Sequence, residues 1–74
     1  MSREPAMHAV FVNDEPREVD EAATLASVLA AMGLSERNGV AAAVNGEVVP
    51  RSSWRARPLA PRDRVVVIRA TQGG

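Results

Sequence analysis

The sequence predicts an α+β fold in which one main helix packs on a mixed sheet of about five short strands, in the order ββαβββ. Three observations lead to this prediction: one segment has the apolar spacing of an amphipathic helix, several runs have the length and composition of strands, and an Asn-Gly pair marks a hairpin. With 74 residues, the chain has room for one domain, near the lower size at which chains fold without disulfides or metals.

The first two strands are expected to form a hairpin. His8–Val12 has the composition of a short strand, and Asn13–Pro16 carries residues that favour turns. Arg17–Val19 would be the returning strand. Residues 1–7 are polar and contain a proline, so we expect them to form a flexible extension ahead of the domain.

The main helix has the clearest signals in the chain. Thr24 can accept a hydrogen bond from a backbone N–H of the first turn, and Gly33 can end the helix in a left-handed turn. Between them, four apolar residues recur at i, i+3, i+4 and i+7 and so share one face of a helix: Leu25, Val28, Leu29 and Met32.

A second hairpin follows the helix. Val40–Val44 and Glu47–Val49 flank the pair Asn45-Gly46, in which both residues tolerate positive φ. The next stretch, Arg51–Pro61, is interrupted by prolines and is expected to be irregular, with one helical turn over Ser53–Ala56.

Two side chains of this irregular stretch have expected roles. Trp54 is large and apolar, and we expect it to close one end of the core. Arg51 is expected to be an ordinary surface charge and not a partner contact.

The last strand is expected at the centre of the sheet, because the near-continuous apolar run Val65–Ile68 suggests that both of its faces are at least partly covered. A helix laid across a mixed sheet whose first and last strands are central and parallel is the β-grasp architecture of ubiquitin-like proteins. We therefore expect a β-grasp domain over residues 8–70, followed by a flexible tail at residues 71–74.

Composition excludes several classes of function. Nine basic and nine acidic residues cancel, so no excess of charge favours nucleic acid or an anionic membrane as a partner. The chain has no cysteine and no lysine, and so has no thiol, disulfide, thiolate-bound metal or side-chain amine. It also lacks the apolar core of a signal peptide and any run near the roughly 20 residues of a membrane-spanning helix. We expect a cytoplasmic protein.

The sequence offers no conventional catalytic group. His8 is the sole histidine and has no evident partner, so a structural or surface role is favoured over chemistry. The acidic pairs Asp14-Glu15 and Asp20-Glu21 are explained as solvated charges of a turn and a helix start. No metal-ligand spacing is present. Gly73 and Gly74 remain without a local structural explanation.

These two glycines suit a chain end that other proteins act upon. Glycine has no Cβ, so its backbone can enter a narrow pocket, and the residues Thr71–Gly74 reach roughly 13 Å when extended. Thr71 and Gln72 would contact the wall of such a pocket or serve as a spacer. An α-carboxyl is ionised at neutral pH and is a poor electrophile, so a partner must activate it, for example by adenylation. The chain is then a carrier and not an enzyme.

Residues 8–74 resemble the ThiS family of sulfur carrier proteins of thiamine biosynthesis. The resemblance lies in "VND" at Val12–Asp14, the helix "TLASVLAAMGL" at Thr24–Leu34, the hairpin "AVNGEVVPRSSW" at Ala43–Trp54, and the terminal Gly-Gly. One departure is Ala60–Asp63, where the family commonly has a Gly-Asp turn and this chain offers Pro61 as another route to a turn.

The resemblance implies the chemistry of the chain end. A ThiF-like enzyme would use ATP to adenylate Gly74, and the product would become a thiocarboxylate with sulfur from a donor such as a cysteine desulfurase. The thiocarboxylate would deliver sulfur to a ThiG-like thiazole synthase. Gly73, Gln72 and Thr71 would present Gly74. The carrier itself would bind no cofactor or metal, and neither nucleic acid nor a membrane would be a partner.

Three alternatives stay open on the sequence alone. The chain could be a sulfur carrier of another pathway, such as a molybdopterin-synthase small subunit or a carrier for cysteine synthesis, although the hairpin and the short length favour thiamine. It could be a ubiquitin-like modifier transferred to lysine, or a plain interaction module with an inert tail. Alternate residues of the last strand, with Phe11 or its neighbours, would form a docking patch for a partner. Which alternate residues face outward stays open, because all of Val65–Ile68 are apolar.

Overall fold

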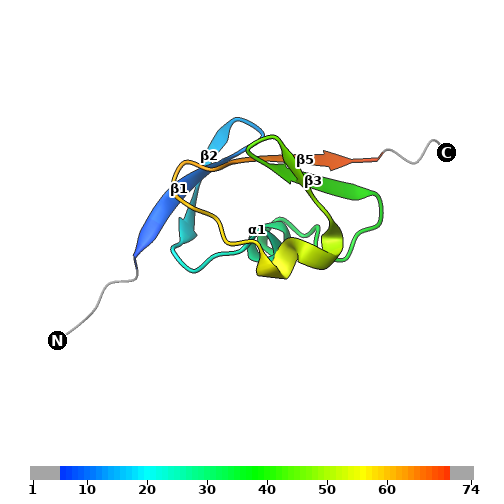
Figure 1. Ribbon diagram of the computed structural model, residues 1–74, viewed down its shortest axis with the longest axis horizontal. Helices are drawn as coiled ribbons and strands as arrows, with labels where there is room; N and C mark the ends of the chain where they lie inside the picture. The colour runs from blue at the N-terminus through cyan, green and yellow to red at the C-terminus, as the bar shows by residue number, and fades with distance from the viewer. Residues whose placement is uncertain (1–5, 71–74) are drawn as a thin grey trace.

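The computed structural model describes residues 6–70, which form one five-stranded sheet in the order β2-β1-β5-β3-β4 with two helices on one side of it (Figure 1). The elements are β1 (Met7–Val12), β2 (Glu15–Asp20), α1 (Leu25–Ala31), β3 (Val40–Val44), β4 (Glu47–Val49), the 3₁₀ helix η1 (Arg51–Ala56) and β5 (Arg64–Arg69). The predicted ββαβββ order and β-grasp architecture are confirmed. β5 lies in the middle of the sheet, parallel to β1 and antiparallel to β3.

The first hairpin is tighter than the sequence predicted. Its turn consists of Asn13 and Asp14 alone, at φ 51° and 70°, which is the geometry of a two-residue turn that matches the twist of the strands. The expected turn over Asn13–Pro16 is therefore wrong in length, and β2 runs from Glu15 to Asp20. Pro16 pairs with Phe11 at the edge of the sheet, where a residue without an N–H is tolerated.

The first strand also begins slightly earlier than expected, since Met7 already pairs with Asp20 and Ala6 accepts a hydrogen bond from the N–H of Glu21. Met7 therefore belongs to β1 and not to the expected extension. Residues 1–5 lie outside the described part of the chain.

Helix α1 begins and ends where the local signals place it. The hydroxyl of Thr24 accepts a hydrogen bond from the N–H of Ser27, and the hydroxyl of Ser27 accepts one from the N–H of Thr24, which together form a capping box. Leu25, Val28 and Leu29 are buried, as the predicted apolar stripe requires. Gly33 has φ +75°, so it stops the helix in the left-handed region.

The stretch after β4 is more regular than expected. The helical turn predicted over Ser53–Ala56 extends back to Arg51. Trp54 is 3% exposed and its indole Nε1 donates to the carbonyl oxygen of Val49 at 2.9 Å. It closes the core as predicted, with its polar atom paired.

Arg51 is exposed, as expected of a surface charge, but it also makes specific contacts within the chain. Its guanidinium donates to the carbonyl oxygen of Ser35 at 2.6 Å and also to that of Arg37, and it lies 4.7 Å from the centre of the Trp54 ring. It therefore joins the loop after α1 to η1, combining charged hydrogen bonds with a cation–π contact.

The core lies between the sheet and the helices. Its most buried side chains come from α1 and from three strands of the sheet: Leu25, Leu29, Val10, Val44 and Val65. On β5 the burial alternates, with Val65 and Val67 facing the helices and Val66 and Ile68 facing away. The sequence predicted that both faces of this strand are at least partly covered. The face toward the helices is buried, whereas on the other face Val66 is 45% and Ile68 61% exposed.

Candidate functional site

The central strand β5 is held at its start by Asn45. The N–H of Asn45 donates to the carbonyl oxygen of Arg64 at 2.7 Å, and its side-chain Oδ1 accepts from the N–H of Arg64 at 2.9 Å. Its Nδ2 donates to Asp63 at 3.0 Å. With φ 52° and Gly46 beside it at 84°, Asn45 forms the predicted hairpin turn and also anchors the start of β5.

Asn13 holds the same strand from the opposite side and nearer its end. The backbone N–H of Asn13 donates to the carbonyl oxygen of Val65 at 2.8 Å. Its side-chain Nδ2 donates to the carbonyl oxygen of Val67 at 3.2 Å, and its Oδ1 accepts from the N–H of Val67 at 2.8 Å. Sequence reasoning placed both asparagines in turns and missed these contacts. The available signal was the dipeptide Val-Asn at the end of two strands, at Val12 and Val44.

The connection into β5 is a tight turn, as Pro61 suggested. The N–H of Asp63 donates to the carbonyl oxygen of Ala60 at 3.1 Å, and the Asp63 carboxylate accepts from the N–H of Ala60 at 2.8 Å. Arg62 follows Pro61 at φ 69°. This is the position at which type II turns favour glycine, so the turn that Pro61 suggested forms and places strain at Arg62.

At its other end, β5 passes close to the loop before β3. The N–H of Ala70 donates to the carbonyl oxygen of Gly39 at 2.6 Å. Gly39 has φ +76°, and a Cβ placed there would lie 3.2 Å from the Cβ of Ala70, so glycine suits both the backbone conformation and the close approach. Thr71, Gln72, Gly73 and Gly74 lie outside the described residues. Ala70 is the last residue whose position can be stated.

The side of the sheet away from the helices carries an apolar patch, which we call the open face. Ala43 pairs with both Val48 and Val66, and Ala41 pairs with Ile68, so these side chains form adjacent rows on one surface. Val48 is 73% exposed. Phe11 lies on the same surface of β1, half-buried. The register therefore settles which residues of the last strand face outward, and Val66 and Ile68 lie directly before the end of β5.

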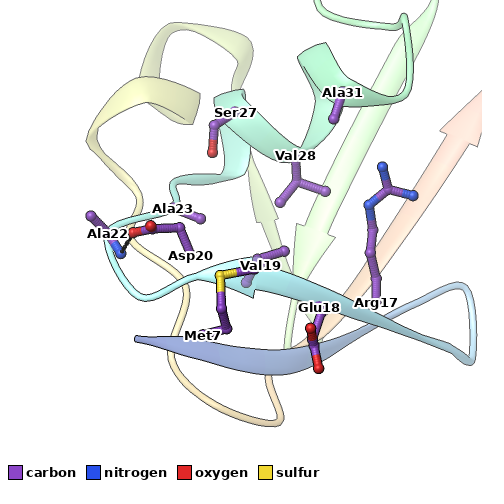
Figure 2. Close-up of a pocket in the computed structure, with 10 residues that line it drawn as sticks. All are labelled: Met7, Arg17, Glu18, Val19, Asp20, Ala22, Ala23, Ser27, Val28 and Ala31. Atoms are coloured by element: carbon purple, nitrogen blue, oxygen red, sulfur yellow. Dashed lines mark hydrogen bonds between the residues drawn. The ribbon is translucent and has the colours of Figure 1, made fainter. Parts of the chain in front are cut away.

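A hollow lies between β2 and α1 and has a volume of about 410 Å³. Figure 2 shows Val19 of β2 and Val28 of α1 on its facing walls, with Asp20 accepting a hydrogen bond from the N–H of Ala22 at 2.7 Å. Ser27 also lines this hollow, but its hydroxyl donates to the carbonyl oxygen of Thr24 at 2.8 Å as part of the helix cap. The hollow therefore brings no free nucleophile next to a base.

The remaining polar groups in residues 6–70 do not assemble a catalytic centre either. His8 is half-buried on β1, opposite Val19, and its Nε2 is buried without a hydrogen-bond partner among residues 6–70. Within those residues, no three histidine or acidic side chains gather closely enough to hold a metal ion. No helix in the described part of the chain has the length and apolarity to cross a membrane.

Comparisons with known proteins agree with this geometry. The sequence profile of the ThiS family matches residues 10–74. The crystal structure of the thiamine biosynthesis protein ThiS from Geobacter metallireducens is similar, with a TM-score of 0.73 and 28% identity over 89% of this chain and 99% of that one. A solution structure of a thiamine biosynthesis protein from the same organism gives 0.71 and 28%, over 89% of this chain and 87% of that one. A search of curated proteins found no match.

The family match spans most of the chain, and the solved structures share its fold over nearly their whole length. The sheet order, with parallel β1 and β5 at its centre, is the β-grasp arrangement that the order of elements predicted. The chain belongs to the ThiS family of small β-grasp sulfur carrier proteins.

Proposed function

We propose that this chain is the sulfur carrier for formation of the thiazole ring of thiamine, and that Gly74 is the residue that carries the sulfur. The observation that carries the proposal is the ThiS family match over residues 10–74, supported by likeness to a thiamine biosynthesis protein along almost its whole length. The carrier acts in the cytoplasm as a co-substrate of other enzymes and performs no catalysis itself.

The chemistry begins at a carboxylate that is ionised and unreactive at neutral pH. A ThiF-like adenylating enzyme joins the Gly74 carboxylate to the α-phosphate of ATP, forming an acyl adenylate and releasing pyrophosphate. The persulfide of a donor such as a cysteine desulfurase then attacks the carbonyl carbon and displaces AMP, forming an acyl disulfide. A thiol reductant, itself oxidised to a disulfide, cleaves the S–S bond, releasing the donor thiol and leaving a thiocarboxylate at Gly74. A ThiG-like thiazole synthase accepts its sulfur.

The open face is the surface on which these partners would dock. Val66 and Ile68 are exposed apolar side chains on the strand that leads to the chain end, and apolar patches of this kind commonly mark protein interfaces. A partner bound to the open face would lie close to the end of β5, after which the chain continues to residues 71–74. Gly73, Gln72 and Thr71 would then span the distance from the domain to the partner's reactive centre.

Intact-mass spectrometry tests the proposal directly. The purified chain is incubated with the adenylating enzyme, ATP and a sulfur source, and the expected result is a mass gain equal to one oxygen replaced by sulfur. The matched control lacks only Gly74 and is expected to show no gain. Absence of the gain in the full chain, under conditions that convert an established carrier, would overturn the proposal.

Binding partners distinguish the alternatives. Transfer of the sulfur to a thiazole synthase supports the thiamine assignment, whereas persistent binding to a molybdopterin-synthase large subunit and none to a thiazole synthase would contradict it. Lysine-linked adducts of this chain in a cell lysate would instead identify a protein modifier.

A further inference from the structure

We propose that Asn13 is a positioning residue of the carrier: its side-chain amide fixes the end of β5 and thereby the point from which the chain continues to Gly74. This inference rests on the proposed function, since it concerns delivery of Gly74 to the enzymes that act on it. Asn13 lies in the β1–β2 turn, far from Gly74 in sequence.

Strand β1 alone covers only the first part of β5. Their register pairs Phe11 with Arg64 and Val12 with Val65, and the N–H of Asn13 makes the next contact, to the carbonyl oxygen of Val65. The chain then turns away into β2 at the positive φ of Asn13 and Asp14. From Val66 onward, the backbone of β1 no longer reaches this side of β5.

Beyond the end of β1, the side chain of Asn13 provides the hydrogen bonds to β5 at one further residue, Val67. A carboxamide offers one donor and one acceptor group side by side, as a peptide unit does, and Asn13 uses them on the carbonyl oxygen and the N–H of Val67. Both bonds are partly buried and join residues 54 positions apart. Partial burial strengthens them, and leaving the Val67 groups unpaired would be costly.

On the opposite side, β5 is held further along. β3 pairs with it as far as Arg69, and the carbonyl oxygen of Gly39 accepts from the N–H of Ala70. With Asn13 in place, both sides of β5 are bonded up to Val67. Without its amide, the residues after Val65 would be held by the β3 side alone.

The same segment carries the docking residues. Val66 and Ile68 are the neighbours of Val67 and project onto the open face. Asn13 therefore fixes the docking patch and the origin of the chain end with respect to each other. A partner that binds the docking patch and receives the chain end depends on the distance and orientation between them, because a small misplacement of a reacting group lowers the rate strongly.

Asn45 provides a matched control for the test. Asn13 and Asn45 have nearly the same φ, 51° and 52°, and each bonds β5 through its amide, but Asn45 does so at the start of the strand. Glycine tolerates this φ, so N13G and N45G each delete an amide without backbone strain. Urea unfolding of both variants establishes that they are folded and compares their stabilities.

The decisive measurement is kcat/KM for thiocarboxylation, with adenylating enzyme, ATP and sulfide present and the carrier varied. We expect N13G to lower kcat/KM at least fivefold and N45G to change it less than twofold at a similar loss of stability. Exchange of the Val67 amide hydrogen should quicken in N13G and not in N45G. N13D keeps an acceptor for the Val67 N–H but places a second carboxylate oxygen against the Val67 carbonyl oxygen, so it should not recover the activity that N13G loses.

The outcomes separate this inference from the proposed function. If the wild-type chain is converted and N13G and N45G lose equal activity, or N13G loses none, the positioning role of Asn13 is overturned and the carrier function stands. If the wild-type chain is not converted at all, the carrier function fails and this inference fails with it.

Discussion

Positions 65 and 66 are both valines and are adjacent on β5. Yet Val65 is 1% exposed, whereas Val66 is 45% exposed. Val65 faces the helices and contributes to the core, whereas Val66 faces the open side of the sheet. The covered face is filled by side chains of this protein, and the open face leaves apolar surface exposed to water. The comparison suggests that substitutions on the first face change stability and substitutions on the second change binding.

The largest effect is expected on the covered face, at its centre. Leu29 of α1 is fully buried, so L29A removes apolar contacts and leaves a cavity that the neighbouring side chains fill only in part. The free energy of unfolding should fall by about 3 kcal/mol, as measured by urea denaturation. A loss below about 1 kcal/mol would mean that the core around α1 relaxes freely, contrary to its burial.

The two adjacent valines test the comparison on one strand. V65A should lower the free energy of unfolding by about 2 kcal/mol through lost burial, and V66A by about 0.5 kcal/mol through lower strand propensity. Denaturation of both variants under one set of conditions gives the difference. Equal losses would contradict the assignment of Val66 to the open face.

Substitutions on the open face are expected to weaken partner binding. I68S removes an apolar side chain that is 61% exposed, so the unfolding midpoint should move little while KM of the adenylating enzyme for the carrier rises about tenfold, or about 1.4 kcal/mol. The control is R55A, on the far side of the sheet in η1 and exposed, which should leave KM unchanged. An unchanged KM in I68S would place docking elsewhere.

The smallest effect is a gain in stability at the turn into β5. Arg62 occupies φ 69°, where glycine avoids the clash of a Cβ but loses more conformational freedom on folding. R62G should therefore raise the free energy of unfolding by only about 0.5 kcal/mol, with no change in KM. A decrease on thermal or urea unfolding would show that the Arg62 side chain makes a compensating contribution.

Local signals predicted most of the fold. Thr24, Gly33 and the pair Asn45-Gly46 each act through their own backbone neighbourhood, so a sequence can reveal them. The length of the first turn was misjudged, because Pro16 favours turns and is also tolerated on an edge strand. The direction of the last strand's side chains was not predictable, since Val65–Ile68 are apolar in both alternations.

The site was less predictable than the fold because its contacts are long-range. Arg51 reaches the carbonyl oxygens of the loop after α1, and Asn13 reaches Val67 across 54 positions. Arg51 belongs to no recognisable spacing, and the Val-Asn dipeptide that contains Asn13 was interpreted only as the start of a turn. Gly74 was singled out from composition and resemblance and stays a prediction, since it lies outside the described residues.

The central place of β5 also bears on how the domain is synthesised. It is the last element made and the strand that joins the β1–β2 hairpin to the β3–β4 hairpin. Until Arg69 has left the ribosome, the nascent chain holds two hairpins with no strand between them, and two-stranded hairpins are marginal in water. Folding of this domain therefore waits until β5 is available, as it does for other folds closed by distant strands. A chain cut before Arg64 lacks the strand that joins the two hairpins, and we expect it to remain unfolded.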